Sequence, residues 1–257
     1  MPPWRTLLTP PATGAENMAL DEALMERARE TGEWVLRIYA WSSPTLSLGR
    51  NQTALGRYDL DEIRRRKYDV VRRPTGGRAI LHHREITYSV TAPAAHAGDL
   101  RESYERINAL LMHGLRSLGV GAQVAAPAAR AAAPGIAPCF DAPSAGELML
   151  GGRKLAGSAQ WRADDALLQH GSILLEDDQS DLAALTTGAH RDIPAPATLR
   201  EAMGRVPSSS EVAAALEMSV RALEDLHVTP LAVDDALRAR AVALVVRYLD
   251  EGWTWRR

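Results

Sequence analysis

The sequence predicts an α+β fold built on a mixed, largely antiparallel β-sheet flanked by helices. Strand-like segments fill about the first two thirds of the 257-residue chain, and many of them are joined by short turns. Helical patterns are interspersed among the strands and gather toward the end of the chain. Regular alternation of strand and helix, which would indicate a parallel sheet, does not occur. The length permits one large domain or two smaller ones.

The N-terminal part is predicted to form a helix followed by two strands. Thr13 and Glu16 give the T-x-x-E pattern of a capping box, in which both side chains pair with otherwise unpaired backbone N–H groups. The segment "NMALDEALMERARETG" then carries apolar residues at helical spacing, and Gly32 is suited to end the helix. "WVLRIYAW" and "TLSLG", on either side of a Ser-Ser-Pro break, are typical of strands.

A long amphipathic helix follows a second group of short elements. "DLDEIRRRK" predicts a short helix, and "YDVVRR", "RAILHH" and "ITYSVTA" predict strands, the first two separated by the turn "PTGG". Asp99 and Glu102 cap the helix that runs from Asp99 to Leu118, and Gly119 ends it. The spacing predicts one buried face. Its members are Leu100, Tyr104, Ile107, Leu111, Leu115 and Leu118.

The second half begins with a low-complexity segment and then returns to strands. Residues 125–138, rich in Ala and Pro, indicate a loop that we expect to be poorly ordered without substrate. "ELMLGGRKLAGSAQWR" predicts a hairpin with a Gly-Gly turn, and "ALLQHGSILL" a further strand. After Asp177 the pattern is helical. Ser208 and Glu211 form a second capping box, and the last helix covers about residues 234–249.

Composition and charge narrow the class of protein. Hydrophobic residues make up 46% and charged residues 24%, as in ordinary globular proteins. With one cysteine no internal disulfide can form, which fits a reducing cytosol. The chain shows neither a signal-peptide pattern nor an apolar run of about 18 residues, so we expect a cytoplasmic protein without a membrane span. The net charge of −2 gives no general attraction to nucleic acid.

The local charge is uneven between Arg64 and Arg73. "RRRK" at residues 64–67 and the pair Arg72 and Arg73 lie close together in the chain. They could attract an acidic partner or substrate, or they could belong to a solvated helix face.

The segment "RRPTGGRAILHH", residues 72–83, is rich in groups that a binding site could use. The adjacent glycines Gly76 and Gly77 follow a strand and allow close approach of the backbone to a ligand. Flanking arginines could bind a carboxylate or a phosphate. The segment matches neither nucleotide-binding glycine fingerprint. From these residues alone, a tight turn with solvated arginines is an equal alternative.

Cys139, Lys154 and His170 are candidate reactive groups, each with a structural alternative. Lys154 lies in a strand-like run between glycines, where its ammonium could face a carbonyl or phosphate oxygen, or it could point to solvent. His170 could be a base or a structural hydrogen-bond donor. Cys139 needs a nearby cation to become a nucleophile, and buried cysteines are usually inert. No metal-binding motif occurs, and apart from His82 and His83 the histidines are scattered.

Taken together, several stretches resemble the biotin/lipoate A/B protein ligase superfamily, and within it the cysteine-dependent octanoyltransferases. The matching stretches occur in the order of the family and cover about residues 4–175. They are "AENMALDEAL", "RIYAW" with "TLSLGRNQ", "RRPTGGRAILHH" with "EITYSV", "CFDAPSAGELMLGGRKLAGSAQ", and "LQHGSILL".

This resemblance implies a single catalytic domain over residues 1–257, helical from about residue 178, and no cofactor. It implies that Cys139 is the nucleophile and that Lys154 acts beside the reacting carbonyl. The family commonly has His-Asp where this chain has His82-His83, so we expect His83 to make a local structural contact. The residues expected to bind substrate are Arg73, Thr75, Gly76, Gly77, Arg78, His82, Gly157 and His170.

The implied reaction moves octanoyl from octanoyl-acyl carrier protein to a lysine of a lipoyl domain through a cysteine thioester. The acceptor would be glycine cleavage H protein or the E2 component of a 2-oxoacid dehydrogenase. Three alternatives stay open at this point. They are an amidotransferase between lipoyl domains, an ATP-dependent lipoate-protein ligase, and a non-catalytic acyl-binding protein.

Overall fold

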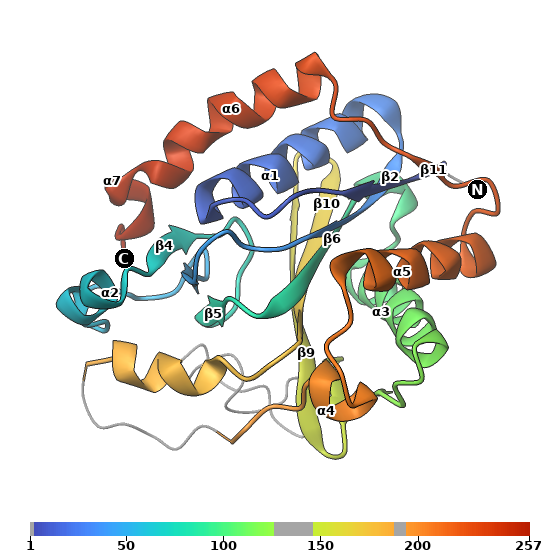
Figure 1. Cartoon of the computed structure of the whole chain (residues 1–257). Helices are drawn as coiled ribbons and strands as arrows, with labels where there is room; N and C mark the ends of the chain where they lie inside the picture. Colours follow the sequence, from blue (N-terminus) through green and yellow to red (C-terminus); the bar gives the residue numbers. More distant parts are fainter. Residues whose placement is uncertain (1–2, 126–145, 188–193) are drawn as a thin grey trace.

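The computed structural model describes residues 3–125, 146–187 and 194–257. Within these ranges the strands form an eight-stranded sheet in the order β11-β1-β2-β6-β10-β9-β8-β7 (Figure 1). Its strands are β1 (Trp4–Leu8), β2 (Trp34–Tyr39), β6 (Glu85–Pro93), β7 (Gln123–Val124), β8 (Leu148–Leu150), β9 (Arg153–Ala163), β10 (Ala166–Leu174) and β11 (Thr229–Pro230). Strands β11, β1 and β2 run parallel and the other neighbours antiparallel, which confirms the predicted mixed sheet.

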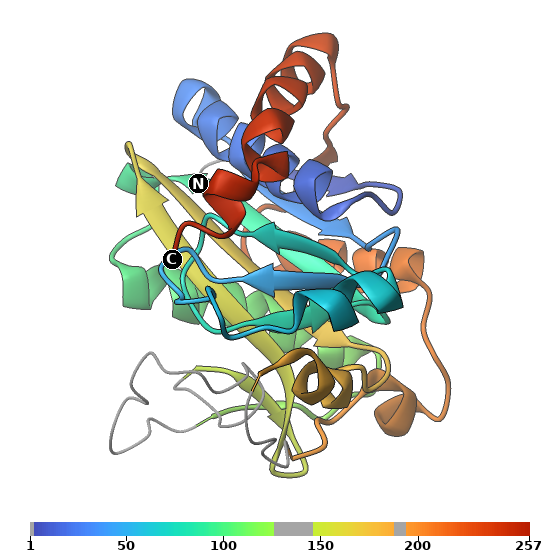
Figure 2. The same cartoon turned by 90° about the vertical axis from the view of Figure 1, so that its left-hand side faces the viewer.

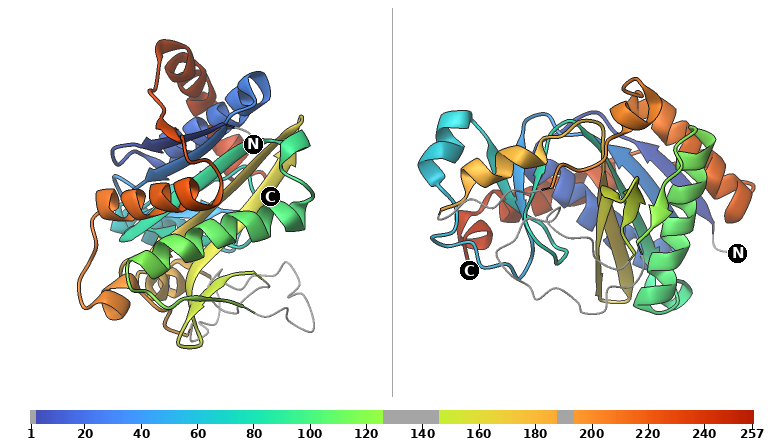
Figure 3. Two further views of the ribbon diagram at one scale, coloured as in Figure 1. Left: turned by 90° about the vertical axis from the view of Figure 1, so that its right-hand side faces the viewer. Right: turned by 90° about the horizontal axis from the view of Figure 1, so that it is seen from below.

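Helices cover both faces of this sheet (Figures 1 and 3). On one face α1 (Gly14–Thr31) packs with α6 (Asp235–Leu249), and on the other α3 (Leu100–Ser117) packs with α5 (Ser209–Leu223). Neighbouring residues of β10 illustrate the two faces, because successive side chains of a strand point in opposite directions. Leu167 belongs to the core shared with α3 and α5, whereas Leu168 packs with Met25 of α1.

A smaller sheet lies against the start of α1. It has the order β4-β3-β5 in the described residues and consists of β3 (Thr45–Leu48), β4 (Asp69–Arg72) and β5 (Ile80–His82). Val71 of β4 packs with Ala15 and Met18 of α1. The remaining elements are α2 (Leu60–Arg66), η1 (Ala94–His96), η2 (Gln179–Leu185), α4 (Leu199–Met203) and α7 (Glu251–Thr254). Figures 1 and 2 show α7 and the C-terminus beside the small sheet.

Most of the predicted helix ends are confirmed. Thr13 and Glu16 form the capping box of α1, and Gly32 ends that helix with φ +73°. Asp99 and Glu102 form the capping box of α3. Leu100, however, is 52% exposed, so its place on the buried face of α3 was wrong. It is the first residue of the helix.

Only one of the two hydrogen bonds of the second predicted capping box is formed. The Ser208 hydroxyl accepts from the Glu211 N–H, as expected. The Glu211 carboxylate instead pairs with Arg205, because that guanidinium offers a stronger partner than a backbone N–H.

The Gly-Gly hairpin between β8 and β9 is confirmed. Gly151 and Gly152 have φ values of +56° and +77°, which residues with a Cβ rarely adopt. The short strands β1 and β11 were not predicted, since their sequences lack a clear alternation. The predicted loop at residues 125–138 lies outside the described residues from residue 126 onward.

Candidate functional site

A pocket lies between the large sheet and the small sheet, beneath the start of α1. Its empty volume, including the open mouth, is about 430 Å³. Residues from α1, β2 and the small-sheet side form one part of the wall: Met18, Tyr39, Trp41, Arg73, Gly77, Ile80 and His82. Residues from β6, β9 and β10 form the other: Thr87, Gly157, Ser158, Ala159, His170, Gly171 and Ser172. The predicted residues Arg73, Gly77, His82, Gly157 and His170 therefore share one pocket.

The glycine-rich segment packs closely against the loop after β3. A Cβ on Gly49 would lie 2.0 Å from the Gly77 carbonyl oxygen, so no larger residue fits there. The Arg50 N–H donates to the Thr75 carbonyl at 2.8 Å, which ties the two segments together. Gly77 has φ +95°, as its close approach requires. A Cβ on Gly76 would meet no described atom within 4 Å, whereas a Cβ on Gly77 would lie 2.7 Å from Nη2 of Arg73. Of the two glycines, only Gly77 is therefore required for steric reasons.

Arg73 is buried and holds this segment in shape. Its guanidinium donates to the carbonyl oxygens of Gly76 at 2.7 Å, Arg78 at 2.8 Å and Ser47 at 3.0 Å. Arg78 thus contributes its backbone to the site. Arg73 also lines the pocket, so a polar group bound there would lie near its charge.

Arg72 and Arg73 do not belong to the predicted basic surface. Arg72 is fully buried and donates to the carbonyl oxygens of Gly49 at 2.6 Å and Thr254 at 2.8 Å. Burial, followed by the nearby Arg256, lowers its pKa to about 10. Arg64 and Arg65 are exposed and pair with carboxylates of their own helix. The arginines of the short helix are thus paired with carboxylates and the following pair is buried, whereas Lys67 is exposed. This arrangement fits the solvated helix face better than a basic surface that runs from residue 64 to residue 73.

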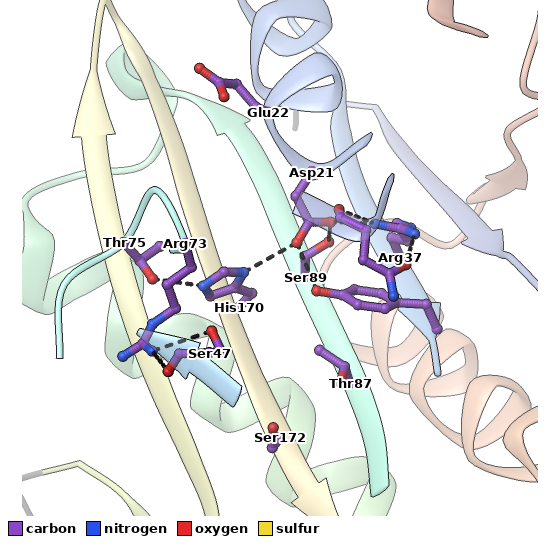
Figure 4. A network of polar contacts seen from close by, with 12 residues as sticks. Asp21, Glu22, Arg37, Ser47, Arg73, Thr75, Thr87, Ser89, His170 and Ser172 are labelled. Carbon is purple, nitrogen blue, oxygen red and sulfur yellow. Dashed lines mark hydrogen bonds and ion pairs between the residues drawn. The ribbon is translucent and has the colours of Figure 1, made fainter. Parts of the chain in front are cut away.

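His170 lies in a buried polar network that crosses from β10 to α1 (Figure 4). Its Nδ1 lies 3.1 Å from Oδ2 of Asp21, and its Nε2 lies 2.7 Å from Oγ1 of Thr75. Burial lowers the pKa of His170, so the ring is neutral at pH 7. Because Asp21 accepts, we assign the proton to Nδ1, and Nε2 then accepts from the Thr75 hydroxyl.

Asp21 is the centre of this network. Burial opposes its charge, but Arg37, with Nη1 2.7 Å from Oδ1, and His170 hold the pKa of Asp21 below its ordinary value. The hydroxyls of Tyr39 and Ser89 also donate to its carboxylate, at 2.8 Å and 2.7 Å. The network fixes His170 and Tyr39, which both line the pocket.

A second network fixes the wall around His82. The His82 ring stacks on Trp41 with 4.0 Å between ring centroids, and its Nδ1 lies 2.7 Å from Oε1 of Glu85. The hydroxyls of Thr87 and Ser172 donate to the same oxygen. His83 is half exposed, with Nδ1 3.5 Å from Oδ1 of Asp178, and it does not line the described pocket.

Lys154 is buried rather than pointing to solvent. Its Nζ lies 2.5 Å from Oε1 of Glu147, and the two side chains are 3% and 6% exposed. Lys154 does not line the described pocket, whereas Gly157, three residues later on β9, does. Cys139 lies outside the described residues. Lys154 thus lies on β9, the strand that contributes Gly157 to the pocket wall, and its carboxylate partner Glu147 comes from just before β8.

Sequence reasoning missed Asp21, Glu147, Tyr39 and Trp41. A signal for Asp21 was present, since it lies three residues from both Met18 and Leu24 and therefore on the apolar face of α1. A carboxylate on such a face requires a buried partner. Nothing in the local pattern around Glu147 indicates its pairing across the hairpin.

No group of three or more His, Cys, Asp or Glu side chains that could hold a metal ion occurs in residues 3–125, 146–187 and 194–257. Over the same ranges, none of the helices has the length and apolar character needed to cross a membrane.

The sheet, its helical layers and the pocket define a catalytic domain of the lipoyl protein ligase kind. The chain belongs to the family described as Lipoyl protein ligase A/B catalytic domain, which it matches over residues 13–221. It resembles Octanoyltransferase LipM of Kyrpidia tusciae, with 39% identity over 100% of both chains. It resembles the protein of the same name from Symbiobacterium thermophilum with 40% identity over 99% of this chain and 98% of the relative. We conclude that the chain is an acyltransferase of this family.

Solved structures show the same fold. A putative lipoate protein ligase from T. acidophilum superposes with a TM-score of 0.80, 22% identity, and coverage of 99% of this chain and 100% of that one. A lipoate-protein ligase A bound with ATP gives a TM-score of 0.75, 23% identity and 98% coverage of both chains. These similarities confirm the predicted α+β fold.

Proposed function

We propose that this protein is an octanoyltransferase of lipoate biosynthesis. It would move octanoyl from octanoyl-acyl carrier protein to a lysine of a lipoyl domain. The observation that carries the proposal is the pocket behind the glycine-rich segment, in a chain similar over its full length to octanoyltransferases. We further propose that residues 1–257 act as one catalytic domain in the cytoplasm.

The first step is attack of the Cys139 thiolate on the thioester carbonyl of the donor. A carbon–sulfur bond forms to Cys139, and the bond to the carrier thiol breaks. The carrier thiolate leaves and takes up a proton. One thioester replaces another, so the step needs no ATP.

The second step is attack of the acceptor lysine on the enzyme thioester. The neutral amine forms an amide bond, loses a proton, and returns Cys139 to its thiol or thiolate form. Thioester to amide is downhill. In this proposal the Lys154 ammonium stabilises the oxyanion that develops in each step, and Glu147 holds that ammonium in place. An oxyanion donor can lower such a barrier by about 3–4 kcal/mol.

The pocket suits an eight-carbon acyl chain. Apolar groups of Met18, Tyr39, Trp41, Ile80 and Ala159 line it. Each buried CH₂ group contributes about 0.8 kcal/mol to binding. The polar wall groups His82 and His170 are already hydrogen-bonded to other residues, so an acyl chain bound beside them would not take away these partners.

Intact mass after incubation with octanoyl-acyl carrier protein tests the proposal. We expect the enzyme to gain one octanoyl group without ATP, and Cys139→Ala to gain none. Full transfer activity of the Cys139→Ser variant would rule out Cys139 as the nucleophile. A requirement for ATP and free octanoate would identify a ligase, and acyl binding without an adduct a binding protein. Faster transfer from an octanoylated lipoyl domain than from the carrier protein would identify an amidotransferase.

A further inference from the structure

Arginine side chains gather around Trp253 next to the small sheet. The Cζ atom of Arg256 lies 3.8 Å from the Trp253 ring centroid, that of Arg247 4.5 Å, and that of Arg50 5.7 Å. Arg50 also lies over Trp161, with 4.8 Å between its Cζ atom and the ring centroid. Stacking on aromatic rings restricts the directions in which these guanidinium groups can point.

The positive charge of this cluster is not balanced within the described residues. There, neither Arg50, Arg256 nor Arg257 takes part in an ion pair with a carboxylate side chain, whereas Arg247 pairs with Glu22. Partial burial lowers the pKa of Arg256, and the charges of Arg50, Arg257 and Arg247 lower it further. The guanidinium groups of the cluster therefore repel one another, and a bound anion would reduce this repulsion.

The cluster lies at the edge of the pocket. The Arg50 N–H donates to Thr75 of the glycine-rich segment, and one Nη2 of Arg256 donates to the Arg50 carbonyl at 2.5 Å. Trp161 follows the pocket-lining Ala159 by two residues on β9. A macromolecule that contacts the Arg50 side chain would therefore bind next to this edge of the pocket.

We propose that Arg50 and Arg256 form a docking surface for the acidic face of the acceptor lipoyl domain. This inference rests on the proposed function. An acceptor lysine reaches only the length of its four-carbon stem, so the acceptor's surface must lie close to the pocket. The donor carries its acyl group on a much longer prosthetic arm and can dock farther away. The closeness of the cluster to the pocket thus favours the acceptor.

Opposite charges on the two proteins would stabilise the complex between the enzyme and the lipoyl domain. Carboxylates of the lipoyl domain would accept paired hydrogen bonds from the guanidinium groups and relieve their mutual repulsion. Because exposed charges act mainly on encounter and orientation, the effect should weaken with salt.

Binding of a recombinant apo-lipoyl domain of a 2-oxoacid dehydrogenase tests the docking surface. We would compare the wild type, the double variant Arg50→Gln/Arg256→Gln, and the control Arg64→Gln/Arg65→Gln. The control removes the same charge from a helix whose arginines already pair with carboxylates. We expect the double variant to raise the Kd about tenfold at low salt, and less at about 0.3 M salt. The control should bind like the wild type.

The rate of the donor step and a charge-reversal experiment provide two further tests of the docking surface. Acylation by octanoyl-acyl carrier protein should be unchanged in the double variant, because the donor docks elsewhere. Arg256→Glu should be rescued by a lipoyl domain with an acidic residue beside its lysine changed to arginine. Unchanged Kd, or a defect confined to the donor step, would overturn the docking surface. Since binding needs no turnover, a chain that docks but transfers no octanoyl would disprove the proposed function alone.

Discussion

Lys154 and Glu147 form a buried ion pair across the β8–β9 hairpin, with 2.5 Å between Nζ and Oε1. The hairpin brings the two residues together although seven positions separate them in the chain. A buried ammonium is costly without a carboxylate, so Glu147 offsets the cost of burying Lys154 on a strand that also forms part of the pocket wall.

We predict that Glu147→Gln lowers both stability and transfer. Removing one partner of a buried pair typically costs about 3–5 kcal/mol of unfolding free energy. Urea unfolding at pH 7 measures this loss. Glu147→Leu/Lys154→Met should recover much of the stability but no activity, because an apolar pair fits the buried site without supplying a charge. An equally unstable double variant would contradict this account of the pair.

We predict that His170 makes stability depend on pH below its ordinary pKa of 6.5. Its pKa is lowered by burial, so between the folded-state value and 6.5 the unfolded chain binds more protons than the folded one. The His170 contribution is therefore fully present above pH 6.5 and declines as the pH falls below that value. In His170→Gln this part of the pH dependence should disappear. Urea unfolding from pH 5 to pH 8 provides the comparison.

We predict that Gly49→Ala disrupts the pocket whereas Gly76→Ala is tolerated. The added methyl of the first would meet the Gly77 carbonyl at 2.0 Å, and that of the second would meet no described atom within 4 Å. Overpacking of this kind costs about 1–3 kcal/mol. Octanoyl transfer and thermal unfolding of both variants check the prediction, and equal effects at the two positions would argue against it.

We predict that Ala159→Leu shortens the acyl chain that the enzyme prefers. Leucine adds three carbon atoms to the pocket wall, and a misfit in an apolar pocket changes selectivity about tenfold or more per methylene. Competition between hexanoyl- and octanoyl-carrier protein should shift toward hexanoyl. Ala163→Leu, on the same strand but outside the described pocket lining, is the matched control. An unchanged ratio would place the acyl chain elsewhere.

Local patterns predicted the parts of the fold that depend on neighbours in the chain. The capping boxes of α1 and α3 and the Gly151-Gly152 turn follow from residues a few positions apart. The strands β1 and β11 depend instead on pairing between distant parts of the chain, because β1 pairs with β2 along its whole length and β11 pairs with β1. Such pairing leaves little trace in either segment alone.

The sequence predicted which residues belong to the candidate site better than it predicted the contacts that they make. Arg73 and His170 are in the pocket as expected, but Arg73 serves mainly to hold carbonyl groups, and His170 is bonded at both ring nitrogens. Asp21, which pairs with His170, and Glu147, which pairs with Lys154, were missed because neither pairing can be seen in the local sequence pattern. Only the folded arrangement shows which charges neutralise one another.

The hydrogen bond from Arg72 to the Thr254 carbonyl has a consequence for protein synthesis. The same guanidinium holds the Gly49 carbonyl, and Gly49 packs on Gly77 at the pocket wall. Residue 254 is made after every strand and after the other helices of the described chain. A nascent chain that has not yet reached residue 254 therefore lacks the hydrogen bond to Arg72. We expect this part of the pocket wall to take its final arrangement only after α7 has been synthesised.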